Sequence, residues 1–245
     1  MSVKVSKKFF KSLDGLDVPA YFVEPEERKY PDKCVLYVHG YSSSKDENLG
    51  IAVSIANEGF CCVVIDLRGH GENKNEFNEN VLNDVEGVIK ELKKEFKQVI
   101  SIGHSIGGLL SILSSADYVI AISPPLMKKV ADVAKFMLRL NSCKVSEKDE
   151  EVLFRILDKF NPPEKRKSII LYGDGESEAV KKFINDWAKD YAQVFVIKSY
   201  QAKLPEMDVD PKKLMNYLPN FISHLATPCS HETLNVIIQE LKKLS

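Results

Sequence analysis

Short runs of apolar residues alternate with longer amphipathic segments along most of the chain. Compact apolar runs are typical of buried strands, and apolar residues three or four positions apart are typical of helices that cover them. The compact runs predict strands at residues 34–38, 61–65, 99–102, 118–122, 168–172 and 194–197. The amphipathic segments predict helices at residues 49–57, 81–96, 106–115, 178–191 and 233–244. This alternation indicates an α/β domain with a mostly parallel central sheet flanked by helices.

The opening segment follows a different pattern. Strand-like residues 4–12 and 18–24 flank Asp14-Gly15, a dipeptide that favours a tight turn. The chain is therefore expected to begin with an antiparallel pair of strands.

The segment between Pro124 and Pro163 contains two helical patterns and no strand. Regularly spaced apolar residues define one face of each expected helix: Val130, Val133, Met137 and Leu140 in the first, and Leu153, Ile156, Leu157 and Phe160 in the second. Two helices inserted after a strand favour a small helical lid, residues 124–166, over the carboxyl edge of the sheet. The alternative is an ordinary pair of helices packed on the core.

Composition and charge narrow the possible functions. Hydrophobic residues make up 44% of the 245 residues and charged residues 28%, as in an ordinary globular protein. The 34 Lys and Arg residues are balanced by 35 Asp and Glu residues, so no basic excess favours a nucleic-acid partner. Residues 99–113, the longest nearly apolar stretch, are too few to span a bilayer. We therefore expect a small-molecule substrate, no nucleic-acid partner and no membrane span.

The cysteines and the first residues bear on the location of the protein. The five cysteines form no CxxC pair and no metal-ligand spacing: Cys34, Cys61, Cys62, Cys143 and Cys229. The residues after Met1 lack the apolar stretch of a secretory signal. An odd number of cysteines without such a signal favours free thiols in the cytoplasm. No metal ion or other cofactor is expected.

The segment Gly103-His104-Ser105-Ile106-Gly107 carries the strongest chemical signal. It fits the G-x-S-x-G pattern, and it lies between an expected strand and an expected helix, which is the context that this motif requires. Glycines are needed at both ends because side chains there would collide in so sharp a turn. The turn would expose the hydroxyl of Ser105, which needs an adjacent base to act as a nucleophile at pH 7.

Three other segments are similar to parts of the α/β-hydrolase fold. Residues 37–41, Tyr-Val-His-Gly-Tyr, end a strand, as the His-Gly oxyanion segment does in that family. Residues 66–73, Asp-Leu-Arg-Gly-His-Gly-Glu-Asn, match the family's D-x-R-G-H-G loop. Residues 10–24 resemble the opening hairpin of the esterase, monoacylglycerol-lipase and serine-aminopeptidase-like branches. The resemblance covers residues 1–245 as a single α/β-hydrolase domain, with the lid region least constrained.

The resemblance implies roles for the residues around the nucleophile. Ser105 would attack the substrate, and the backbone N–H groups of Tyr41 and Ile106 would form the oxyanion hole. The N–H of Ile106 would lie at a helix N-terminus, where unpaired N–H groups favour developing negative charge. His104 is expected to point away from the substrate and to be structural, and Asp66 to anchor the loop that follows it.

The family's acid follows the strand expected at residues 168–172, in the sequence Gly173-Asp174-Gly175-Glu176. It usually stands three residues after the glycine, a position that Glu176 occupies. Asp174 is the alternative, although Asp before Gly is first of all a turn residue. The acid would hold the imidazole of the base in the correct tautomer.

The family's histidine stands just before the C-terminal helix. His231 directly precedes Glu232 and the last expected helix, which favours it as the general base. His224 is the alternative, since a loop longer than usual separates His231 from the strand that ends at Ile197.

These residues together favour a serine hydrolase that cleaves a carboxylic ester, or a thioester or small amide, through an acyl-enzyme on Ser105. Apolar residues of the expected lid would suit an acyl group: Met127, Phe136, Met137 and Leu138. The alternative is a non-catalytic binding protein of the same fold, because a fold by itself does not imply an activity. The unusual acid and the long loop before the histidine favour that alternative.

Overall fold

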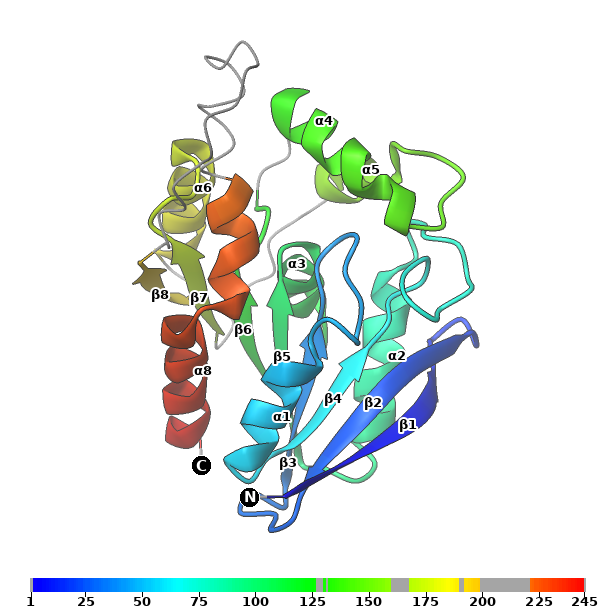
Figure 1. Cartoon of the computed structure of the whole chain (residues 1–245), viewed down its shortest axis with the longest axis vertical. Helices are drawn as coiled ribbons and strands as arrows, with labels where there is room; N and C mark the ends of the chain where they lie inside the picture. The colour runs from blue at the N-terminus through cyan, green and yellow to red at the C-terminus, as the bar shows by residue number, and fades with distance from the viewer. Residues whose placement is uncertain are drawn as a thin grey trace.

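The computed structural model describes residues 2–126, 130, 132–159, 168–189, 192–198 and 221–244. Its centre is an eight-stranded sheet with the order β1-β2-β4-β3-β5-β6-β7-β8 (Figure 1). The strands are β1 (Val3–Lys11), β2 (Asp17–Pro25), β3 (Lys33–Val38), β4 (Cys61–Ile65), β5 (Gln98–His104), β6 (Tyr118–Ile122), β7 (Ser168–Gly173) and β8 (Ala192–Ile197). β1 and β2 form the expected antiparallel pair, and β3 to β8 run parallel to one another. The prediction of a mostly parallel α/β sheet is confirmed.

Helices cover both faces of this sheet. They are α1 (Leu49–Asn57), α2 (Leu82–Leu92), α3 (Ile106–Leu113), α4 (Asp132–Asn141), α5 (Val152–Asp158), α6 (Glu178–Ala188) and α8 (His231–Lys243), with 3-10 turns η1 (Ser142–Lys144) and η2 (Thr227–Cys229). Residues 221–226 are also helical and lead directly into η2. α2, α3 and α6 contribute to the core on one face of the sheet, and α1 and α8 to the core on the other.

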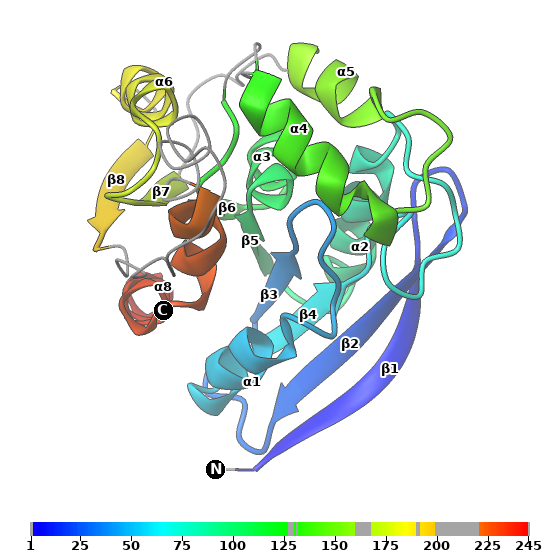
Figure 2. The same ribbon diagram turned by 45° about the horizontal axis from the view of Figure 1, so that its top comes forward.

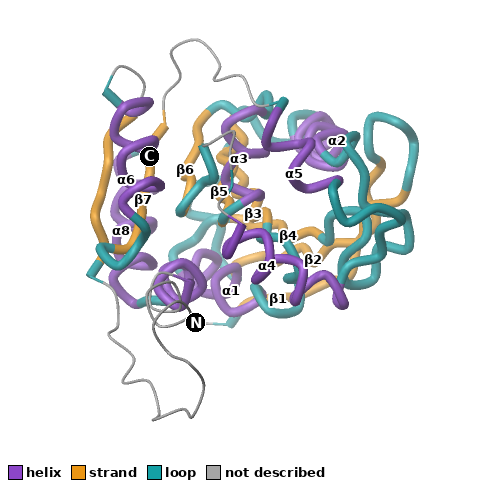
Figure 3. Tube along the Cα trace, turned by 90° about the horizontal axis from the view of Figure 1, so that it is seen from above, coloured by secondary structure: helices purple, strands orange, loops and turns teal. Residues whose placement is uncertain are grey.

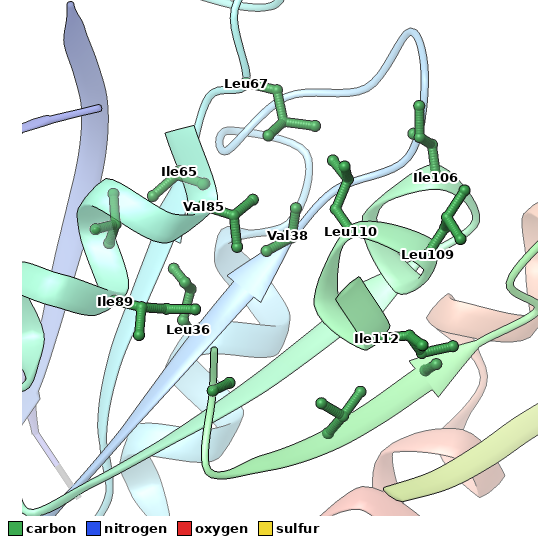
Figure 4. Packing of buried hydrophobic residues seen from close by; sticks show 14 of the residues in the cluster. Leu36, Val38, Ile65, Leu67, Val85, Ile89, Ile106, Leu109, Leu110 and Ile112 are labelled. Carbon is green, nitrogen blue, oxygen red and sulfur yellow. The ribbon is translucent and has the colours of Figure 1, made fainter. Parts of the chain in front are cut away.

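The two cores follow from the alternation of side chains along each strand. Leu36 and Val38 of β3 pack on the side of α2 and α3, where Figure 4 shows them near Val85. Val35 and Tyr37 of the same strand point to the opposite core. Because both faces are covered, the central strands are apolar at nearly every position.

α4 and α5 lie beyond the carboxyl ends of the parallel strands, separate from the helices that cover the two faces (Figures 1 and 2). Seen from above in Figure 3, they cross over the central strands. Leu140, expected on the buried face of α4, is instead 57% exposed. Phe136, one turn earlier on the same helix, is 55% exposed. Val130, just before α4, and Leu138 of α4 are partly buried and pack against the core. Met127 and Phe160, also expected in the lid, lie outside the described residues.

A buried ion pair fixes the loop after β4 to α2 and to the opening hairpin. The guanidinium of Arg68 donates to Asp84 from Nη2 at 2.7 Å and to Asp14 from Nη2 at 2.8 Å. Burial raises the pKa of Asp84, although Arg68 opposes this, and hydrogen bonds from Arg68 lower the pKa of Asp14. Arg68 and Asp84 are each only 1% exposed, whereas Asp14 is 32% exposed.

Asp84→Ala is expected to lower the free energy of unfolding by about 3 kcal/mol, because it leaves a buried guanidinium without its buried partner. Asp14→Ala removes a partly solvated partner of the same guanidinium and should cost only about 1 kcal/mol. Urea unfolding of both variants measures the difference. If both variants lost the same free energy of unfolding, burial of the Arg68–Asp84 pair would not explain its contribution to stability.

Candidate active site

Ser105 occupies a strained turn between β5 and α3. Its backbone has φ 51° and ψ −122°, a conformation that residues with a side chain rarely adopt. Its N–H donates to the backbone oxygen of Ile122 at 2.8 Å, which joins the turn to the end of β6. Strain of this kind persists only where the surrounding structure imposes it, and it is concentrated at functional sites.

The glycines on either side make this turn possible. A Cβ added at Gly107 would lie 2.2 Å from the backbone oxygen of Val38, and one at Gly103 would lie 2.1 Å from that of Gly107. Both distances are far below any van der Waals contact. The collision inferred from the sequence motif is therefore present, and α3 packs directly on the ends of β3 and β5.

Glu176 and His224 meet beside this turn. Nδ1 of His224 donates to Oε1 of Glu176 at 2.8 Å, and the Glu176 side chain is 3% exposed. Burial lowers the pKa of His224, but the charge and the hydrogen bond of Glu176 outweigh it, so that the pKa is raised above its usual value. With Nδ1 occupied by Glu176, the other ring nitrogen, Nε2, is the one available to a reacting group.

The structure does not bring His231 to this site. His231 is the first residue of α8 and is exposed, and the histidine that contacts Glu176 is His224, seven positions earlier in the chain. The reason is that residues 221–226 and η2 form an additional helical stretch before α8. His224 lies within this stretch, whereas His231 begins the final helix. Asp174 is likewise exposed, in the turn before Glu176.

His104, expected to be structural, contacts the helical stretch that carries His224. Its Nε2 lies 3.0 Å from the backbone oxygen of His224, and the two imidazole rings lie with centroids 4.9 Å apart. Burial and the neighbouring His224 lower the pKa of His104 to about 3, so its ring is neutral at physiological pH. Pro228, four residues after His224, is the sequence signal for this contact, since it removes the N–H that would otherwise bond to the carbonyl of His224 in a continuing helix.

Of the two expected oxyanion donors, Ile106 directly follows Ser105 as the first residue of α3, and Tyr41 follows Gly40, where an added Cβ would lie 3.4 Å from Cβ of Ser105. Neither the N–H of Tyr41 nor that of Ile106 donates to an acceptor within the described part of the chain. The Tyr41 hydroxyl donates to Oε1 of Glu147 at 2.6 Å, which ties the segment after β3 to the segment between η1 and α5. The assignment of these N–H groups as the oxyanion hole stays a prediction.

Asp66 holds the loop that carries Tyr41. Its carboxylate accepts the backbone N–H of Lys45 at 2.7 Å, the Lys45 ammonium at 2.9 Å and the backbone N–H of Glu72 at 2.9 Å. Two loops that are distant in sequence are thereby joined at one buried side chain. The expected anchoring role of Asp66 is confirmed by these contacts, and the partner from the first loop, Lys45, was not anticipated from the sequence.

A cavity of about 620 Å³, counting its open mouth, contains the three candidate residues Ser105, Glu176 and His224. The rest of its described lining is mostly apolar: Pro125, Val130, Ala134, Leu138, Leu157, Ser177, Val180 and Phe221. Ala134 and Leu138 belong to α4 and Leu157 to α5, so both helices form part of the cavity wall. An apolar cavity with a few convergent polar groups is the usual form of a small-molecule site.

No group of three or more His, Cys, Asp or Glu residues in the described part of the chain could hold a metal ion. Within the same residues, no helix has the length and hydropathy to cross a membrane.

Solved structures of esterases resemble this fold. An esterase of Pyrococcus furiosus superposes with a TM-score of 0.61 at 18% sequence identity, over 89% of this chain and 90% of that one. An esterase of Pyrobaculum calidifontis superposes with a TM-score of 0.64 at 13% identity, over 96% of this chain and 82% of that one. At such identities the likeness shows a common fold.

Sequence comparison agrees with the structural likeness. The Bacillus subtilis (strain 168) protein named "Putative esterase YitV" is 32% identical in a match that covers 40% of this chain and 46% of that protein. The chain therefore matches somewhat less than half the length of that relative. Residues 33–162 match the family model of the alpha/beta hydrolase fold. Because this match spans more than half of the sequence and includes the Ser105 turn, the chain belongs to the α/β-hydrolase fold family.

Proposed function

We propose that the protein is a serine hydrolase that cleaves a carboxylic ester through an acyl-enzyme on Ser105. The observation that carries this proposal is the Glu176–His224 hydrogen bond at 2.8 Å in the same cavity as the strained Ser105. The catalytic acid, base and nucleophile are then Glu176, His224 and Ser105, in the chain order Ser, acid, His that is typical of the family. Thioesters and small amides would follow the same chemistry.

In the first half of the reaction, Ser105 Oγ attacks the acyl carbonyl carbon while Nε2 of His224 takes the hydroxyl proton. Glu176 accepts the hydrogen bond from Nδ1, which fixes the tautomer and stabilises the imidazolium that forms. The carbonyl oxygen becomes an oxyanion, and the N–H groups of Ile106 and Tyr41 are the proposed donors to it. His224 then gives its proton to the leaving alcohol as the carbon–oxygen bond breaks.

In the second half, a water molecule takes the place of the alcohol. His224 accepts a proton from this water as it attacks the acyl carbonyl, and then returns the proton to Ser105 Oγ as the acid is released. No step requires a cofactor.

The cavity lining supports a substrate with an uncharged, apolar acyl group. Apart from Glu176 and His224, which the mechanism uses, the described lining carries no ionisable side chain. We propose that α4 and α5, within residues 124–166, act as a lid that shields this group from water, because Leu138 and Leu157 face the cavity from above the sheet.

The five cysteines are free thiols, which supports a cytoplasmic location.

Labelling with a fluorophosphonate probe tests the proposal directly. The wild type is expected to gain the mass of a single adduct, and Ser105→Ala to gain none, because only an activated serine reacts. Ser105→Ala should also lower the turnover of a p-nitrophenyl ester by about 10⁴-fold or more. Intact-mass spectrometry and absorbance measure the two outcomes.

The control is the circular dichroism spectrum of both proteins, which should be the same. A well-folded wild type that neither forms the adduct nor cleaves p-nitrophenyl acetate would overturn the proposal and favour a binding protein with the same fold.

A further inference from the structure

The ring of His104 lies between two parts of the candidate active site. On one side its Nε2 is 3.0 Å from the backbone oxygen of His224. On the other side the oxyanion segment packs against it so closely that a Cβ at Gly40 would lie 3.0 Å from Nδ1 of His104. The ring is nearly fully buried, at 8% exposure, and so it fills the space between these two segments.

The contact with His224 defines the tautomer of His104. A backbone carbonyl only accepts hydrogen bonds, so the proton must be on Nε2 of His104. The ring is neutral, because burial keeps the pKa of His104 low, at about 3. His104 is therefore a fixed, uncharged donor and does not itself exchange protons at the pH of the reaction.

The carbonyl of His224 needs a donor from outside its own helix. Residues 221–226 are helical, and a continuing α-helix would supply the N–H of residue 228 to this carbonyl. Residue 228 is proline, which has no N–H. This helical stretch thus presents an acceptor that the following backbone cannot satisfy in the usual way, and the ring of His104 provides the hydrogen bond.

We propose that His104 is a positioning residue, which holds the backbone of the base His224 in register with the nucleophile Ser105. This inference rests on the proposed function. Glu176 holds the ring of His224 through Nδ1, and His104 holds its backbone, so the base has one anchor on each side. Because His104 and Ser105 are consecutive residues, a single hydrogen bond and one peptide unit link the base to the nucleophile. A base held by only one anchor would reach Ser105 in fewer of its conformations.

The test compares His104→Leu, which keeps the volume and removes the donor, with His104→Gln, whose side-chain amide can place an N–H near the former Nε2. His104→Leu is expected to lower kcat for a p-nitrophenyl ester about tenfold, with KM within about twofold, because orientation and not substrate binding is lost. The rate of fluorophosphonate labelling should fall by the same factor. His104→Gln should restore most of both rates.

A second readout does not depend on turnover. The pKa of the His224 ring, followed by NMR, should lie above 6.5 in the wild type and fall in His104→Leu, because the ring leaves Glu176 more often. The acidic limb of the pH profile of kcat/KM should shift to lower pH in the same variant. A purely structural role for His104 would lower the melting temperature and leave the His224 pKa unchanged.

The outcomes separate this inference from the proposed function. A wild type that is inert to the probe and to esters overturns the function, whereas the NMR titration still tests the contact. An active wild type with unchanged kcat and unchanged His224 pKa in His104→Leu overturns the positioning role alone. If His104→Leu does not fold, His104→Asn replaces it, since its amide is too short to reach the His224 carbonyl and it should show the same losses.

Discussion

Replacing His224 with Ala is expected to lower kcat/KM for a p-nitrophenyl ester by about 10⁴-fold or more, because it removes the base from Ser105. His231→Ala is the matched control, seven positions later in the same C-terminal region. It should leave kcat/KM within about twofold, because His231 is exposed at the start of α8 and does not line the cavity. Steady-state kinetics of the two variants, at equal protein concentration, measures the contrast.

The two histidines make the test decisive, because position in the sequence favours His231 and position in space favours His224. Full activity in His224→Ala, or a loss of activity in His231→Ala that its stability does not explain, would contradict the assignment of the base. Labelling by the fluorophosphonate probe should follow the same order, since the probe depends on the activation of Ser105.

Acid is expected to destabilise the fold well above the pH at which most carboxylates titrate. Three buried histidines have lowered pKa values, mainly because burial disfavours the charged ring: His39 at about 4, and His70 and His104 at about 3. In the unfolded chain each would titrate near 6.5. As the pH falls below 6.5, the unfolded chain binds protons that the folded chain does not, so the free energy of unfolding decreases.

Between pH 7 and pH 5 the three histidines should together cost on the order of 6 kcal/mol, or about 2 kcal/mol each. His224 acts in the opposite sense near neutral pH, because its raised pKa lets the folded chain bind that proton at a higher pH than the unfolded chain does, so it offsets a small part of this loss. Asp84 and Glu147, whose pKa values burial raises, act in the opposite sense at lower pH, so the measurement stops at pH 5. Urea unfolding at half-unit intervals gives the slope.

His70→Asn provides the internal control for this experiment. Its amide N–H occupies the place of Nδ1 of His70, which donates to the backbone oxygen of Arg68 at 2.9 Å. In this variant the free energy of unfolding should fall less steeply with decreasing pH, by about 1.4 kcal/mol per pH unit, because one fewer histidine takes up a proton on unfolding. The contributions of His39 and His104 should remain. A free energy of unfolding that does not change between pH 7 and pH 5 would contradict the neutral, buried state of these rings.

Local sequence was sufficient to predict most of the fold. The eight strands and the opening hairpin were recognisable because each depends on a run of apolar residues or on a turn dipeptide within a few positions. The face of α4 was predicted less well, since Leu140 fits the helical period but points to solvent. A period shows which residues share a face and does not show which face meets the core, because that depends on how the helix crosses the strands.

The sequence by itself determined the turn that carries Ser105, since Gly103, Ser105 and Gly107 interact with residues that are adjacent in the chain or at the ends of neighbouring strands. Only the tertiary structure decided which histidine faces Glu176. The two are 48 positions apart, and an additional helical stretch before α8 moves the site histidine upstream of the place that the last helix would suggest. The contact between His104 and the His224 carbonyl also depended on the fold, because a proline removes one backbone hydrogen bond and a side chain 120 positions away in the sequence supplies another.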